Sequence, residues 1–122
     1  VMEESGESFN YETALAHAKE GDVEAQYELG WRHAIGMEAE LDDTVAVGWL
    51  VKAAEARHML AQNNMGARHY TGDGVDLNLK KAYRFFYLAA NQGDRKAGKN
   101  LDVIAKKLTG DELAECRRLV NA

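Results

Sequence analysis

Four histidines and one cysteine are the residues of this chain that could support a metal site or a catalytic centre. His33 and His69 stand 36 residues apart, and each follows an arginine. In neighbouring helices their imidazoles would lie roughly 10 Å apart, too far to share one metal ion. We therefore interpret both as residues that pack against a partner helix. His17 and His58 have no evident partner in the sequence.

The single cysteine, Cys116, excludes a disulfide within the chain. Its helical spacing from Leu113 and Val120 predicts a buried thiol that acts as a small hydrophobe. The glycine-rich segment 72–74 lacks the lysine and the strand of a phosphate-binding loop. No pattern combines a nucleophile, a base and oxyanion donors, so we predict a protein that is not an enzyme and that needs no metal or cofactor.

These residues belong to a chain that repeats itself, because residues 58–93 align on residues 22–57 without a gap. The matched pairs include Ala25 with Ala61, Gln26 with Gln62, Gly30 with Gly66, Gly36 with Gly72, Ala46 with Ala82, and Trp49 with Phe85. A fixed period of about 20–50 residues is the mark of a solenoid. The sequence therefore predicts an all-α fold, with about seven helices and no strand.

Cap residues and glycines recur at the joints of the repeat and set the helix limits. Helices are expected near residues 10–20, 23–34, 43–56, 59–70, 79–91 and 111–120, with a further one after Asp94. Gly30 and Gly66 fall inside helices, where glycine costs about 1 kcal/mol relative to alanine. We expect both to mark a close contact between paired helices.

The repeat divides the chain into an arm and a repeat domain. We expect a flexible arm over residues 1–9 and a repeat domain over 10–122, composed of a half repeat (10–21), two full repeats (22–57 and 58–93) and a partial repeat with a C-terminal cap (94–122). The last helix is short and charged, as is usual where a repeat array ends.

Charge is unevenly distributed along the 122 residues. Residues 1–45 hold twelve acidic and two basic residues, and residues 46–122 hold thirteen basic and eight acidic residues, giving −10 and +5. An acidic chain is a poor nucleic-acid ligand, and no apolar run is long enough for membrane insertion. The lone cysteine favours the cytoplasm, and a periplasmic location stays open if a signal peptide was removed.

The repeated motif A-Q-x-x-[LM]-G-x-x-x-x-x-G is followed by a cap, an alanine, an aromatic residue and a closing Ala-Ala pair. In these features the chain resembles the Sel1-like repeat family, which is related to the tetratricopeptide repeat. The resemblance covers residues 10 to about 108 and implies a right-handed superhelix of antiparallel helix pairs. It also implies an adaptor role of bacterial type, with a protein or peptide bound in a concave groove. His33 and His69 depart from the family pattern, which often has tyrosine there.

If Ala25, Leu29 and His33 point inward, other positions of the same helices line the groove. The predicted partner-binding residues are Tyr27, Trp31, Asn63, Asn64, Ala67, Tyr70, Lys99 and Lys106. The competing interpretation packs Trp31 against the first half repeat and leaves the lysines as solvated surface. We expect a monomer or a weak homo-oligomer. An alternative function is a structural or regulatory subunit that joins head to tail through its acidic and basic ends, and a metal-binding or enzymatic protein is the third possibility.

Overall fold

A computed structural model describes residues 8–121, and within that range the chain forms α-helices and no strand. The helices are α1 (Tyr11–Lys19), α2 (Val23–Ile35), α3 (Asp43–Glu55), α4 (Met59–Thr71), α5 (Leu79–Asn91), α6 (Arg95–Lys107) and α7 (Gly110–Val120). The predicted all-α fold is confirmed, and the predicted helix limits agree to within one or two residues.

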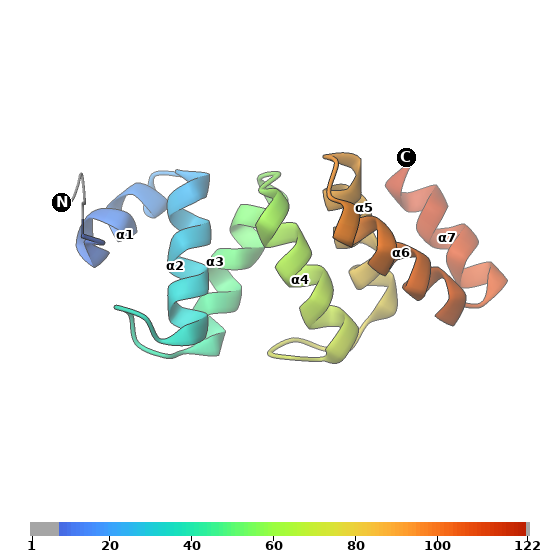
Figure 1. Ribbon diagram of the computed structural model, residues 1–122, viewed down its shortest axis with the longest axis horizontal. Helices are drawn as coiled ribbons and strands as arrows, with labels where there is room; N and C mark the ends of the chain where they lie inside the picture. The colour runs from blue at the N-terminus through green and yellow to red at the C-terminus, as the bar shows by residue number, and fades with distance from the viewer. Residues whose placement is uncertain (1–7, 122) are drawn as a thin grey trace.

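Helices α1 to α6 pack successively side by side and α7 packs on α5, giving a rod with α1 and α7 at opposite tips (Figure 1). Figure 1 shows α2, α4 and α6 toward the viewer, with α3 and α5 behind them. None of the helices among residues 8–121 is long and apolar enough to span a membrane.

Each helix begins at a residue whose side chain accepts a hydrogen bond from the backbone N–H three positions later. These N-caps are Asn10, Asp22, Asp42, His58, Asn78, Asp94 and Thr109. Thr109 also forms a reciprocal capping box with Glu112. The glycines that end α2 and α4, Gly36 and Gly72, have φ values of 72° and 76°, a left-handed conformation that glycine adopts without strain.

The glycines inside α2 and α4 lie where paired helices touch. A Cβ atom on Gly30 would lie 2.6 Å from Cγ of Leu50, and one on Gly66 would lie 2.9 Å from Cδ1 of Phe86. The predicted close contact is therefore confirmed. It joins α2 to α3 and α4 to α5, and it fixes the distance between the two helices of each repeat.

The core continues from repeat to repeat through apolar residues of both helices of each repeat. Leu29, Leu50, Met65 and Ile104 are the largest fully buried side chains. Trp49 is half-buried against the first core cluster, which is formed by Ala14, Ala18, Ala25 and Leu29, whereas the next residue, Leu50, is fully buried.

The predicted flexible arm falls mostly on residues 1–7, which lie outside the described residues. Phe9, also assigned to that arm, packs against the first core cluster, and the guanidinium of Arg32 lies 3.7 Å from its ring centre. At the other end of the chain Cys116 is buried, with 3% of its surface exposed, as its helical spacing predicted.

Candidate partner-binding site

The predicted binding residues lie on α2, α4 and α6, which share one side of the rod (Figure 1). We call this side the α2–α4–α6 face. Local sequence explains the orientation of these helices. In α2, Asp22 fixes the first turn by accepting from the amide of Ala25, and Ala25 and Leu29 are buried. Tyr27 and Trp31, on another side of the same helix, stay half-exposed.

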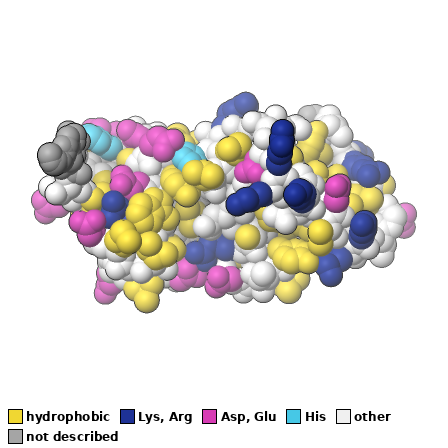
Figure 2. All heavy atoms as spheres, in the orientation of Figure 1, with side chains coloured by type: hydrophobic (Ala, Val, Ile, Leu, Met, Phe, Trp, Pro, Cys, Tyr) yellow, Lys and Arg dark blue, Asp and Glu magenta, His cyan; other side chains and the backbone are white. Residues whose placement is uncertain are grey.

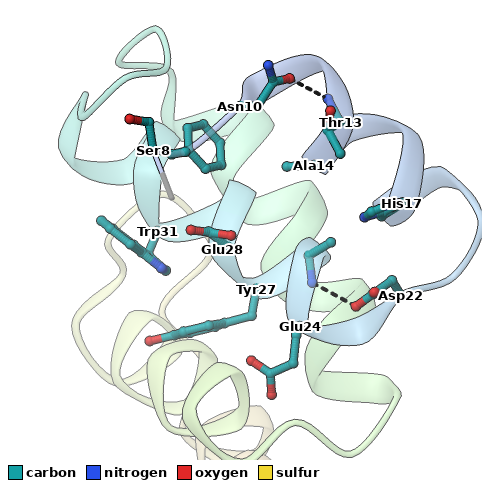
Figure 3. Close-up of a pocket in the computed structure, with 12 residues that line it drawn as sticks. Ser8, Asn10, Thr13, Ala14, His17, Asp22, Glu24, Tyr27, Glu28 and Trp31 are labelled. Carbon is teal, nitrogen blue, oxygen red and sulfur yellow. Dashed lines mark hydrogen bonds between the residues drawn. The ribbon is translucent and has the colours of Figure 1, made fainter. Parts of the chain in front are cut away.

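A hollow of about 640 Å³ between α1 and α2 contains Tyr27 and Trp31, and we call it the N-terminal hollow. Its lining residues are Ser8, Phe9, Asn10, Thr13, Ala14, His17, Asp22, Glu24, Ala25, Tyr27, Glu28 and Trp31. Figure 3 shows Trp31, Glu28, Tyr27 and Glu24 following one another along α2, with Thr13 and His17 on α1 and Asn10 at the N-cap of α1.

Tyr27 also has a structural contact, because its ring stacks on His58 at a centroid distance of 4.3 Å. Burial raises the pKa of the Tyr27 phenol above its ordinary value, and the nearby Glu24 carboxylate raises it further. The phenol is therefore neutral at physiological pH and can donate a hydrogen bond.

The expectation that His58 has no partner is wrong. Its Nδ1 accepts from the amide of Ala61 at 3.2 Å, and its Nε2 lies 3.1 Å from a carboxylate oxygen of Glu24. Residues 22 and 94, one repeat away on either side, are aspartates that cap their helices in the same way. That periodic cap position was the signal that sequence reasoning missed.

A second hollow, of about 200 Å³, lies between α4 and α6, and we call it the central hollow. Its lining residues are Ala67, Tyr70, Thr71, Phe86, Asn100, Val103 and Ile104. Ala67 and Tyr70 were both predicted as binding residues, and the structure brings them together with Val103, which is 45% exposed. An apolar side chain could bury its surface here.

Asn63 and Asn64 lie near the central hollow along α4, but part of each amide is already bonded within the chain. The Nδ2 of Asn63 donates to Asp94, the N-cap of α6. The Oδ1 of Asn64 accepts from Nε of Arg68 at 2.8 Å. Among the described residues, Oδ1 of Asn63 and Nδ2 of Asn64 have no hydrogen-bond partner, and these two atoms remain for a ligand.

Lys99 and Lys106 are exposed on α6 and form no ion pair with any residue of 8–121. Figure 2 shows this side of the molecule, with acidic side chains concentrated over the N-terminal half and lysines and arginines over the C-terminal half. The α2–α4–α6 face thus runs from an acidic, aromatic end to a basic end.

The paired histidines hold loops in place. Nδ1 of His33 lies 2.7 Å from the carbonyl oxygen of Glu40, and Nδ1 of His69 lies 2.9 Å from that of Asp76. Nε2 of His33 also contacts the Tyr11 hydroxyl at 2.9 Å. Within residues 8–121 no three His, Cys, Asp or Glu side chains gather into a group that could hold a metal ion.

The arginine before each histidine was not predicted to be important, yet it connects several elements. Arg68 is buried, and its guanidinium bonds to Asn64, to the Asp43 carboxylate at 3.0 Å, and to the carbonyl of Asp73 at 3.3 Å. It thereby ties α4 to the start of α3 and to the α4–α5 loop. The 36-residue spacing from Arg32, which bonds to its own loop at Met37, was the available signal.

Comparison with known proteins agrees with this architecture. The Sel1 repeat family model matches residues 23–58 and 60–94, which together make up more than half of the chain. The chain therefore belongs to the Sel1 repeat family, whose members generally mediate protein–protein interactions and are typically scaffolds without enzymatic activity.

Two solved structures share the fold. One is c5321, a protective antigen of uropathogenic Escherichia coli strains with an SLR fold, which matches at 29% identity and a TM-score of 0.82. That match covers 90% of this chain and 24% of the antigen, so the chain spans about a quarter of its length. The other is a Sel1 repeat protein from Oxalobacter formigenes, at 25% identity and a TM-score of 0.74, covering 90% of this chain and 96% of that one. No curated protein matches the chain significantly.

Proposed function

We propose that this chain is a protein–protein interaction module that binds a peptide segment of a partner protein on its α2–α4–α6 face. The observation that carries the proposal is the central hollow, where Ala67, Tyr70 and Val103 offer apolar surface in the middle of the face. Leu60, 50% exposed on α4, adds apolar surface to that face. Aromatic and apolar anchors in a pocket contribute most of the affinity of typical interfaces.

The polar residues of the face suit an extended peptide. The free Oδ1 of Asn63 and Nδ2 of Asn64 provide one acceptor and one donor for peptide backbone groups. Lys99 and Lys106 provide positive charge for an acidic part of the ligand, and such rim charges act mainly on the association rate. The binding residues predicted from the sequence therefore have distinct roles, with Ala67 and Tyr70 at the centre.

A selection from a library of random dodecapeptides on the immobilised protein tests the proposal. Selected peptides are then measured against Ala67→Arg, which fills the central hollow, and against Ala114→Arg, a matched change at an exposed position of α7. We expect the first variant to weaken binding by about tenfold or more and the second to leave it unchanged. Equal binding to both variants would place the contact outside the central hollow.

A second candidate function is head-to-tail association of the chain as a structural or regulatory subunit. It is supported by the net charges of −10 over residues 1–45 and +5 over residues 46–122, and by Leu119, 57% exposed on α7. Sedimentation velocity over a range of protein concentrations tests it, and we expect association at low salt that is lost at high salt. A constant monomer at low salt contradicts this alternative.

A further inference from the structure

The N-terminal hollow marks a helix face that lacks the neighbour found in the next repeat. There, α2 packs on α3 with Gly30 against Leu50 and the backbone of Ala46. Thirty-six residues before Leu50 and Ala46 stand Ala14 and Asn10, and both line the hollow. Among residues 8–121, no helix covers α1 in the way that α2 covers α3.

The lining of this hollow is polar where the equivalent surface of the next repeat is apolar. Asn10, Thr13 and His17 stand in the positions that Ala46, Trp49 and Ala53 occupy on α3. Although Oδ1 of Asn10 already caps α1, an apolar helix would leave the Asn10 Nδ2 group, the Thr13 hydroxyl and the His17 ring nitrogens without hydrogen-bond partners, which disfavours their burial. A polar occupant suits the surface better.

Charge defines the occupant further. The twelve lining residues include Asp22, Glu24 and Glu28 but no lysine or arginine. Two of these carboxylates already contact a nitrogen-bearing side chain: Glu24 contacts His58, and Glu28 lies 3.2 Å from Arg32. Both remain available, because the Glu24 side chain is 84% exposed and that of Glu28 is 40% exposed.

Two aromatic rings stand beside these carboxylates along α2 (Figure 3). Trp31 already attracts one cation of the chain, since the guanidinium carbon of Arg32 lies 4.7 Å from its ring centre. A cation is attracted to the face of an aromatic ring, and a carboxylate in reach adds a charge-assisted hydrogen bond.

We infer that the N-terminal hollow binds a lysine- or arginine-rich segment of a partner protein. Basic side chains of that segment lie between Trp31 and Tyr27 and pair with Glu24 and Glu28. The inference rests on the proposed function and sets the orientation of the bound peptide. Its basic part lies over α1 and α2, and its acidic part lies over Lys99 and Lys106. This arrangement follows the charge distribution of the face itself (Figure 2).

The probe is hexa-arginine amide, titrated into uniformly ¹⁵N-labelled protein and followed by amide chemical shifts, with hexaglutamate as the opposite-charge control. The test variant is Glu24→Gln with Glu28→Gln. The matched control is Glu12→Gln with Asp102→Asn, which changes the net charge equally at exposed positions that do not line the hollow. We expect chemical-shift changes confined to α1 and α2. The affinity for hexa-arginine should fall by about tenfold or more in the test variant and change by no more than about twofold in the control.

The inference is overturned by equal losses of affinity in the two double variants, by shifts that centre on another part of the chain, or by binding of hexaglutamate to α1 and α2. Sedimentation of the protein alone addresses a further occupant. Two double variants are compared with the wild type: Glu24→Gln with Glu28→Gln in the hollow, and Arg117→Gln with Arg118→Gln on α7. If the wild-type protein self-associates and each double variant abolishes this, the hollow binds a second copy of the chain. If hexa-arginine fails while selected peptides still depend on Ala67, the inference falls and the proposed function stands.

Discussion

Nε2 of Gln92 donates to Oε1 of Gln62 at 2.8 Å and to the carbonyl of Arg57 at 3.0 Å. One repeat earlier the equivalent of Gln62 is Gln26, whose Oε1 is buried and has no hydrogen-bond partner among the described residues. The missing donor has a simple cause: the position of Gln92 is occupied by Ala56. Both residues are C-caps with similar backbone angles, φ −89° and ψ 2° for Gln92 and φ −91° and ψ 20° for Ala56.

We therefore predict that Ala56→Gln stabilises the fold by about 1 kcal/mol, because it supplies a donor to the buried oxygen of Gln26. Urea unfolding followed by circular dichroism measures the change as a higher midpoint at an unchanged slope. Ala56→Met is the control, because it has similar length and no donor. An equal gain from methionine would show that packing, and not the hydrogen bond, causes the effect.

Gly66→Ala is expected to destabilise the protein by about 1–3 kcal/mol, since the new methyl group would press on the rigid Phe86 ring. Helix propensity alone predicts the opposite sign, a gain of about 1 kcal/mol. Gly48→Ala is the matched control, because that glycine is also inside a helix and a Cβ atom there would meet nothing within 4 Å. We expect Gly48→Ala to raise the melting temperature and Gly66→Ala to lower it; a rise in both would argue against a close contact at Gly66.

The fold was predictable because cap residues and glycines recur along the chain at the repeat spacing. Asp22, Asn78 and Asp94 are strong N-caps, and Gly36 and Gly72 adopt the left-handed conformation that ends a helix, so each boundary is determined within a few residues. The spacing of the repeat then determined which helices pair.

The site was less predictable, because the outward side chains meet partners from other repeats. The pattern predicted Asn63 as a residue of the binding face, but it could not show that Asp94, 31 residues later, would accept a hydrogen bond from its amide group. Likewise, Arg68 reaches Asp43 across 25 residues. Such pairs depend on distances between helices, which a single sequence does not contain.

Arg68→Ala is predicted to lower the free energy of unfolding by about 2–3 kcal/mol, because hydrogen bonds from a buried charged group to Asp43, Asn64 and the α4–α5 loop are lost together. Arg68→Lys should recover little, since an ammonium lacks the planar fork of donors. Arg84→Ala is the comparison: its guanidinium bonds to Glu55 at 2.8 and 3.2 Å, but both side chains are about half exposed. We expect Arg84→Ala to lower the free energy of unfolding by less than about 1 kcal/mol. Similar losses of stability in Arg68→Ala and Arg84→Ala would refute the role assigned to Arg68.

Cys116 is predicted to resist thiol reagents in the folded protein, because burial raises the pKa of its thiol and lowers the thiolate fraction. Folding favours the neutral thiol, so this contribution to stability is fully present below the ordinary thiol pKa and is lost as the pH rises from there through the raised pKa of the folded state. Labelling with a chromogenic disulfide in 0 M and denaturing urea measures the protection, and Ala114→Cys in a Cys116→Ala background is the exposed control. Equal labelling rates of the two cysteines without denaturant would contradict a buried thiol.

The last prediction separates the two ends of the α2–α4–α6 face by binding kinetics, using peptides selected on the wild-type protein. Lys99→Glu with Lys106→Glu should slow association and weaken its salt dependence, because exposed charges steer the encounter. Arg117→Glu with Arg118→Glu changes the net charge equally on α7 and should have a smaller effect. Trp31→Ala should instead raise the dissociation rate and lower the binding free energy by about 2 kcal/mol, because the ligand would no longer bury the indole ring. Stopped-flow fluorescence with labelled peptide measures both rates, and a Trp31→Ala variant that changes only association would remove Trp31 from the bound interface.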